Sequence, residues 1–227
     1  MNKLLPTLFI AASTLVAVLN AAQAQDVSAN IGTTNNYVWR GVTQTDKGFA
    51  VQGGADVEFD NGFSAGAWAS NVDWGVGDVE VDIYGNYSIP LPMRFAEKGI
   101  SANVGGIAYL YPAKPSSAAE ANFVEVNAGL DFAVGPTTFS TSLAFSPDVA
   151  GETTWYYSGG LGIPLGDMFE FFGGVGYYQW EVADSWMDYN VGVAATYLNY
   201  TLSGYYAGTD LDGDDGNFVI MLSTSFP

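Results

Sequence analysis

Residues 35–44 read NNYVWRGVTQ, and this stretch carries Arg40, one of six basic residues in a chain with 24 acidic residues. It ends an alternating run in which apolar and aromatic side chains take one parity and mostly polar side chains take the other. In a β-strand the two parities lie on opposite faces. We therefore expect one strand from Asp26 to Arg40, with Arg40 facing inward and Trp39 facing outward.

The N-terminal residues have the pattern of an export signal. Lys3 precedes a mostly apolar run that starts at Leu4, and Ala22-Gln23-Ala24 follows it as a small-x-small cleavage pattern. The apolar run is about 16 residues long, whereas a membrane-spanning helix needs roughly 20. A retained membrane helix is therefore the weaker alternative. We expect a signal peptide at 1–24 and a single domain at 25–227.

Composition excludes several functional classes. A net charge of -18 argues against nucleic-acid binding, which needs clustered Lys and Arg. The chain has no histidine and no cysteine, which excludes Ser-His triads, Asp-His pairs and thiol mechanisms. We expect no catalytic residues and no cofactor. A glycosidase-like carboxylate pair among Asp56, Glu58, Glu80 and Asp82 is a minor alternative to solvated charges.

The part after the signal has the rhythm of a large antiparallel sheet. About twelve alternating segments of about ten residues are separated by turn signals, and this length fits tilted transmembrane strands. Asp60-Asn61-Gly62 is such a turn, and 112–121 is expected to be the longest loop. Closing the sheet removes edges that hydrocarbon would not tolerate. The predicted fold is all-β, an antiparallel transmembrane β-barrel of about 12 strands, with ten or fourteen as alternatives.

The two faces of these strands predict where the barrel lies. The outward parity is almost free of charge, as expected for a surface in contact with lipid. A soluble sandwich or lipocalin-like barrel, with this parity facing a core, is the alternative. We expect the outer membrane as location, with its lipid and lipopolysaccharide as partners. Aromatic residues near strand ends are expected to form interfacial girdles; they are Tyr37, Trp39, Phe59, Tyr87, Phe132, Trp155, Tyr197 and Phe226.

The last strand, Asn217 to Phe226, ends the chain on an aromatic residue followed by Pro227. An alternating terminal strand of this kind resembles the signal by which outer-membrane barrels are recognised for insertion. We therefore expect the barrel-assembly machinery as a partner.

Two blocks resemble the start of the TorF-type porin family of Gram-negative bacteria. The first is Tyr-x-x-Arg-Gly-x-x-Gln, at Tyr37, Arg40, Gly41 and Gln44. The second is Gly-x-x-x-Gly-x-Trp-x-Ser-Asn-Val, which starts at Gly62 and ends at Val72. About forty residues carry this resemblance, which implies an outer-membrane β-barrel with a porin role and no established substrate.

The inward parity gathers acidic residues opposed mainly by one arginine. Charged pore walls set ion selectivity, so we expect passive diffusion of small cationic or neutral polar solutes. Two alternatives remain open, a lumen closed by salt bridges and a non-conducting barrel with a structural or surface-interaction role. The lumen candidates are Arg40, Asp56, Glu58, Glu80, Asp82, Glu125, Asp131 and Asp188.

One segment has a partial metal-binding pattern. Asp210, Asp212 and Asp214 have the spacing of the first three ligands of a calcium loop. Glycine is absent from the sixth position, however, and glutamate from the twelfth. We expect no metal site and treat these three residues as a weak calcium candidate in an acidic loop.

Overall fold

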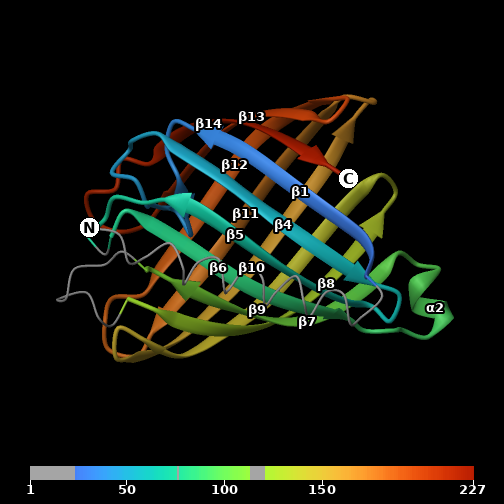
Figure 1. Ribbon diagram of the computed structural model, residues 1–227, viewed down its shortest axis with the longest axis horizontal. Helices are drawn as coiled ribbons and strands as arrows, with labels where there is room; N and C mark the ends of the chain where they lie inside the picture. Colours follow the sequence, from blue (N-terminus) through green and yellow to red (C-terminus); the bar gives the residue numbers. More distant parts are fainter. Residues whose placement is uncertain (1–23, 76, 113–120) are drawn as a thin grey trace, which may run out of the picture.

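The computed structural model describes residues 24–75, 77–112 and 121–227, and within them the chain forms a closed antiparallel barrel of 12 strands (Figure 1). The predicted fold class and strand number are confirmed. The signal-peptide prediction and most of the predicted 112–121 loop lie outside the described residues. The barrel strands are β1 (Ala24–Thr34), β4 (Ala50–Phe59), β5 (Phe63–Asn71), β6 (Val79–Ser88), β7 (Ile100–Leu110), β8 (Phe123–Val134), β9 (Thr137–Val149), β10 (Glu152–Leu165), β11 (Phe169–Trp180), β12 (Trp186–Tyr197), β13 (Tyr200–Thr209) and β14 (Asn217–Phe226).

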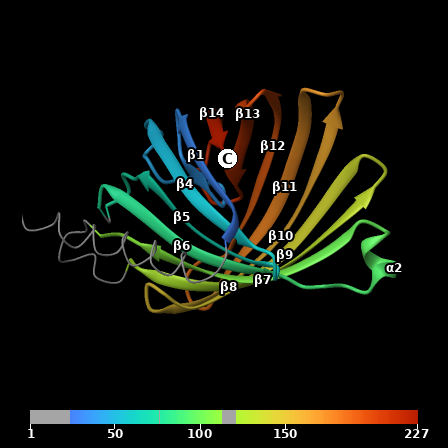
Figure 2. The same cartoon turned by 45° about the vertical axis from the view of Figure 1, so that its right-hand side comes forward.

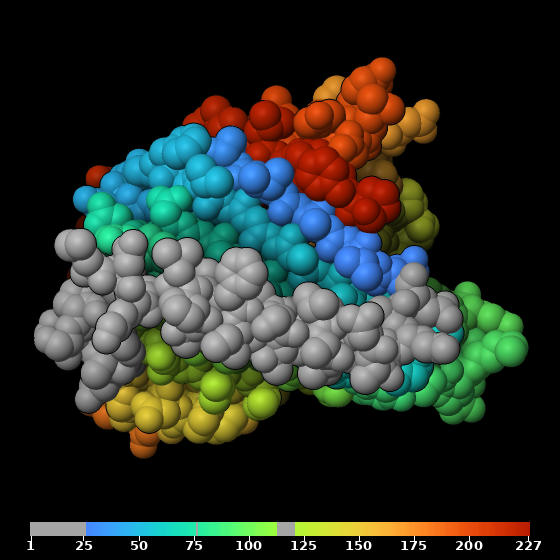
Figure 3. All heavy atoms as spheres, in the orientation of Figure 1, coloured from blue at the N-terminus to red at the C-terminus, as the bar shows by residue number. Residues whose placement is uncertain are grey.

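Each barrel strand pairs with its neighbours in the chain, and β1 closes the wall. It pairs with β4 on one side, where Thr34 is the register partner of Ala50, and with β14 on the other, where Thr34 is the partner of Met221. The space-filling view shows β1 lying between β14 and β4 (Figure 3). The wall therefore has no open edge along β1, β4 and β14, as a sheet in an apolar solvent requires.

The outward face is apolar on every barrel strand. Residues such as Ile31, Ile83, Val126, Val191 and Ile220 are about half exposed on it. Within the described barrel strands, the parity that carries these residues has no Asp, Glu, Lys or Arg. Strand alternation therefore separates an uncharged exterior from an interior that carries the charges.

The two ends of the barrel differ. We call the end where β1 finishes the loop end; there, segments such as 35–49, 181–185 and 210–216 connect strands. At the opposite turn end, four connections have two or three residues, and a longer one, 89–99, joins β6 to β7; Gly62 has a φ of 84° in the short turn 60–62. The short helix α2 (Met93–Ala96) projects from the turn end (Figure 2). The sequence did not predict this helix. In the described part of the chain, no helix has the length and apolarity to cross a membrane.

The first strand is shorter than predicted. It ends at Thr34 instead of Arg40, and the chain then turns into a separate two-stranded sheet of β2 (Val38–Trp39) and β3 (Val42–Thr43). We call residues 35–48 the inner hairpin. Its tip, Arg40 and Gly41, has φ values of 47° and 82°, and a two-residue hairpin turn of this kind needs positive φ at both positions. A Cβ at Gly41 would collide with the backbone carbonyl of Gly208, 2.6 Å away.

Candidate functional site: a constriction in the lumen

The inner hairpin is attached to the barrel wall on the side of β12 to β14. Asn36 donates a side-chain hydrogen bond to Asn217, whose amide in turn donates to the carbonyl of Gly41. The indole of Trp186 donates to the carbonyl of Arg40 at 3.1 Å. A further backbone bond, from Asp73 to the carbonyl of Gln44, connects the hairpin to the neighbouring loop. These bonds hold the hairpin tip inside the barrel.

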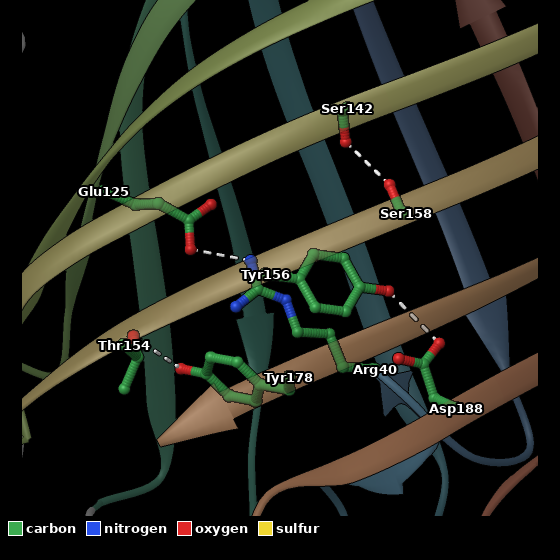
Figure 4. A network of polar contacts seen from close by, with 8 residues as sticks. All are labelled: Arg40, Glu125, Ser142, Thr154, Tyr156, Ser158, Tyr178 and Asp188. Carbon is green, nitrogen blue, oxygen red and sulfur yellow. Dashed lines mark hydrogen bonds and ion pairs between the residues drawn. The ribbon is translucent and has the colours of Figure 1, made fainter. Parts of the chain in front are cut away.

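The side chain of Arg40 crosses to the opposite wall. Its Nη2 donates to Oε2 of Glu125 on β8 at 2.6 Å, and both side chains are more than nine-tenths buried. Its Cζ lies 3.9 Å from the ring centre of Tyr156 and 4.5 Å from that of Tyr178. Figure 4 shows the guanidinium beside these two rings and bonded to Glu125. Aromatic faces attract a desolvated cation. We call the site that the Tyr156 and Tyr178 rings and the Glu125 carboxylate form around the Arg40 guanidinium the cation seat.

On the hairpin's other flank, two phenols hold a buried carboxylate. Tyr37 donates to Oε1 of Glu80 at 2.8 Å, and Tyr111 donates to Oε2 at 2.6 Å. Burial, with the nearby Glu80 charge, raises the pKa of both Tyr37 and Tyr111 well above the usual range. Both phenols therefore keep their protons and remain donors. Glu80 is satisfied by neutral groups and holds Tyr37 of the hairpin against β6 and the end of β7.

Two more carboxylates close to the hairpin lack full pairing. Asp188 accepts a hydrogen bond from Tyr156 on Oδ1, whereas its Oδ2 is buried without a partner in the described structure. Asp82 likewise has a buried, unpartnered Oδ1. Both side chains are about 95% buried, at 5% and 6% exposure. Of the basic residues in the described part, Lys47, Arg94 and Lys98 are exposed. Four buried acids, Glu80, Asp82, Glu125 and Asp188, therefore lie around the inner hairpin, and Arg40 forms an ion pair with one of them, Glu125.

The remaining predicted lumen acids lie deeper or at the turn end. Asp56 accepts a hydrogen bond from Tyr84 at 2.6 Å across β5. Asp131 accepts a weak bond from Ser101 at 3.4 Å, and Glu58 is exposed near the end of β4. The structure thus brings Arg40, Glu80, Asp82, Glu125 and Asp188 together and leaves these three apart.

The hairpin separates two cavities of different character. On the loop side lies a cavity of about 380 Å³ lined by aromatic rings, among them Trp39, Tyr111, Phe123 and Trp180. On the turn side, a space of about 720 Å³ is lined mainly by small and polar residues of β7 to β12, including Asp131. An apolar vestibule and a polar lumen therefore meet at the cation seat.

Two of the predicted girdle residues are placed differently. Tyr37 and Trp39 lie inside the barrel, where the Tyr37 ring contacts Trp68 at 5.5 Å and the Trp39 ring contacts Tyr178 at 5.7 Å. The expectation that Trp39 faces lipid is wrong because the chain leaves the wall after Thr34. The other members lie on the wall; Tyr87, Phe132, Trp155, Tyr197 and Phe226 are exposed there, and Phe59 is partly buried.

Sequence reasoning missed the aromatic residues of the interior. Tyr109, Tyr156, Tyr178 and Trp186 shape the constriction through ring contacts or hydrogen bonds. The sequence does contain a pattern that indicates two of them. Tyr156 shares a parity with Thr154 and Ser158, and Tyr178 shares one with Gly174 and Gly176. An aromatic ring on the small, polar parity at the loop end of a strand indicates a constriction.

The weak calcium candidate does not form a site. No cluster of three metal-ligating side chains exists among residues 24–75, 77–112 and 121–227. Asp210 accepts the N–H of Met187, and Asp214 accepts the hydroxyl of Thr209. Partial burial acts to raise the pKa of Asp214, but hydrogen bonds from Thr209 and Gly216 hold it below its usual value. These carboxylates organise the β13–β14 loop.

Solved structures share this architecture. The KdgM porin superposes with a TM-score of 0.64 at 8% identity, covering 88% of this chain and 99% of that one. The NanC porin gives 0.58 at 12% identity, covering 89% and 100%. An outer membrane channel from Pseudomonas putida F1 gives 0.55 at 8% identity, covering 88% and 94%. The fold is therefore a porin-like barrel.

The family is established by sequence. A family model described as "Bacterial protein of unknown function (Gcw_chp)" matches residues 19–221, and the chain belongs to that family. Among curated proteins, none matches the sequence. The resemblance to TorF-type porins is thus supported at the level of a porin-like barrel, and the narrower assignment stays a prediction.

Proposed function

We propose that this chain is an outer-membrane channel for passive diffusion of small cationic or neutral polar solutes, narrowed by its inner hairpin. The observation that carries the proposal is the combination of an uncharged exterior with buried carboxylates beside the inner hairpin. In a site with little water, such carboxylates attract cations strongly and repel anions. The lipid and lipopolysaccharide of the outer membrane and the barrel-assembly machinery are the proposed partners.

The chemistry of the lumen also distinguishes it from one structural relative. The KdgM porin is known in complex with disordered oligogalacturonate, an acidic sugar chain. In the present chain, Glu80, Asp82, Glu125 and Asp188 are buried around the inner hairpin, and Arg40 forms an ion pair with Glu125. Acidic oligosaccharides would meet like charge there, so we propose cations or neutral molecules instead. The absence of His and Cys supports a non-enzymatic role.

The test is electrical. Purified protein in planar bilayers should give discrete conductance steps, and in a potassium chloride gradient the reversal potential should have the sign of cation preference. Liposome swelling with neutral sugars of increasing size would define the size limit. Anion preference would contradict the proposed selectivity, and the absence of both conductance and swelling would contradict a channel.

A second function has an observation of its own. The hairpin tip is fastened on both sides, to Asn217 and to Glu125, and Tyr178 beside it has no exposed surface. A barrel closed in this way could serve as a structural or surface-interaction protein of the membrane. The swelling experiment separates the two functions, because a closed barrel admits no sugar of any size.

A further inference from the structure

We infer that the seat now filled by Arg40 is a recognition site for the guanidinium group of small organic cations, with Arg40 as its tethered occupant. The inference rests on the proposed channel function for its biological meaning, but the site itself is defined by geometry. Four features of the interior carry it.

The first feature is the shape of the seat. The guanidinium carbon lies within 4.5 Å of the ring centres of Tyr156 and Tyr178, and Glu125 receives one of its N–H groups. Ring faces and a carboxylate are the usual means of binding a delocalised, weakly hydrated cation. A strongly hydrated ion such as sodium gains little from ring faces, so the seat selects an organic cation.

The second feature is the part of the seat that Arg40 leaves unused. Its Nη1 is buried without a partner, and so is Oδ2 of the neighbouring Asp188. Asp188 is held in place by Tyr156, and both border a cavity of about 250 Å³ together with Arg40. An intramolecular guanidinium, restricted by its own backbone, leaves a buried donor and a buried acceptor unpaired. A free cation could adjust its position and satisfy both.

The third feature is the charge of the surroundings. Glu80, Asp82 and Asp188 lie buried around the hairpin in addition to Glu125, and Arg40 is the buried cation of the described part. In the described part of the chain, Arg40 forms an ion pair with only one of these acids, Glu125. An entering cation can therefore interact with a buried carboxyl group that has no ion pair, such as Asp188.

The fourth feature is the route to the seat. Trp39 and Tyr178 contribute to the seat and also line the aromatic cavity of about 380 Å³ on the loop side. An organic cation can therefore rest its apolar part in this cavity and present its charged group to the seat. Arg40 competes for the same place, which lowers the apparent affinity of the wild-type protein.

The test uses the full chain with Arg40→Gly. Arg40 has a φ of 47°, a conformation that glycine adopts without strain, so this change vacates the seat and keeps the turn. The matched control is the double variant Arg40→Gly/Glu125→Gln, which also loses the carboxylate. The probe is millimolar guanidinium chloride, compared with equal sodium chloride and with urea as the neutral molecule of similar shape.

Two readouts distinguish the site from the channel. Guanidinium should raise the thermal midpoint of Arg40→Gly in detergent, as expected for a ligand that binds the folded state, and urea should not. Guanidinium should also block the current that Arg40→Gly carries in bilayers. The double variant should bind guanidinium about tenfold more weakly than Arg40→Gly, because it lacks the carboxylate. Wild type should also bind guanidinium about tenfold more weakly than Arg40→Gly, because Arg40 competes for the site. If Arg40→Gly folds poorly, guanidinium should restore its refolding yield where sodium does not.

Equal responses of the single and double variants to guanidinium, or no response of either, would overturn the site. Guanidinium stabilisation without current in any variant would leave the site standing and contradict the channel. Currents that guanidinium does not affect would support the channel and contradict the site.

Discussion

The two sides of the inner hairpin differ in chemistry although several of the same strands line both. On β11, Tyr178 and Trp180 face the loop-side cavity, whereas Phe172 and Gly174 face the polar space. On β8, Phe123 faces the first and Asp131 the second. On these two strands the lining thus changes from large aromatic residues near the loop end to a mixture with small and polar residues farther along. The constriction is made by side chains and the hairpin, since the wall keeps its strand number throughout.

This gradient explains why the hairpin folds inward. The rings of Tyr109, Tyr178 and Phe123 lie within 6.3 Å of the Trp39 ring, so the aromatic level of the barrel offers Trp39 an apolar contact that solvent at the loop end would not. Arg40 is buried along with it and finds Glu125. The turn-side space is lined mainly by small and polar residues and offers no comparable aromatic surface.

The largest effect should follow from removing the difference between the two sides. Because Thr34 and Ala50 are register partners, replacing residues 35–49 with Asn-Gly would join β1 to β4 by a tight turn. Single-channel conductance should then rise at least several-fold, since the aromatic cavity and the polar space become one lumen. Shortening the exposed segment 181–184 is the matched control and should change conductance little. Unchanged conductance after excision would show that the hairpin does not limit flow.

A smaller effect should follow from weakening the contact between hairpin and wall. Glu125→Gln removes the charge that opposes the buried Arg40, and breaking one member of a buried ion pair destabilises a protein by about 3 kcal/mol. We expect that loss in the free energy of unfolding, measured by urea denaturation. Asp131→Asn on the same strand, on the turn side, should change it by less than about 0.5 kcal/mol. Equal effects would mean that Arg40 gains nothing from Glu125.

The wall was predictable from sequence because its strands obey a local rule. The predicted bounds Asn217 to Phe226 agree with β14, since period-two alternation and flanking turns define each strand. The inner hairpin follows the same alternation through Tyr37 and Trp39, so the rule could not distinguish it from a continued strand. What distinguishes it is non-local, because Arg40 pairs with a residue 85 positions away.

The candidate site was predictable in one respect only. Parity correctly placed Glu80, Asp82, Glu125 and Asp188 on the inward face of their strands, and burial confirms it. Parity does not give depth along the barrel, so it could not show that these four gather at one level while Asp56 and Asp131 lie deeper. Depth depends on the register between strands, which the sequence of each strand does not encode by itself.

The smallest effect should follow from filling the space beside Gly176, where the glycine leaves room for two neighbouring side chains. At Gly176 an added Cβ would collide with the Tyr156 hydroxyl and with Asp188, the pair that borders the cation seat. Gly176→Ala should therefore lower the free energy of unfolding by about 1–3 kcal/mol, as overpacking does. Because the collision separates Tyr156 from Asp188, the Arg40→Gly/Gly176→Ala protein should also bind guanidinium more weakly than Arg40→Gly. Gly204→Ala is the control, since nothing lies within 4 Å of its Cβ position. An unchanged free energy of unfolding in Gly176→Ala would mean that Tyr156 and Asp188 can separate freely. The cation seat would then depend on Glu125 and the rings alone.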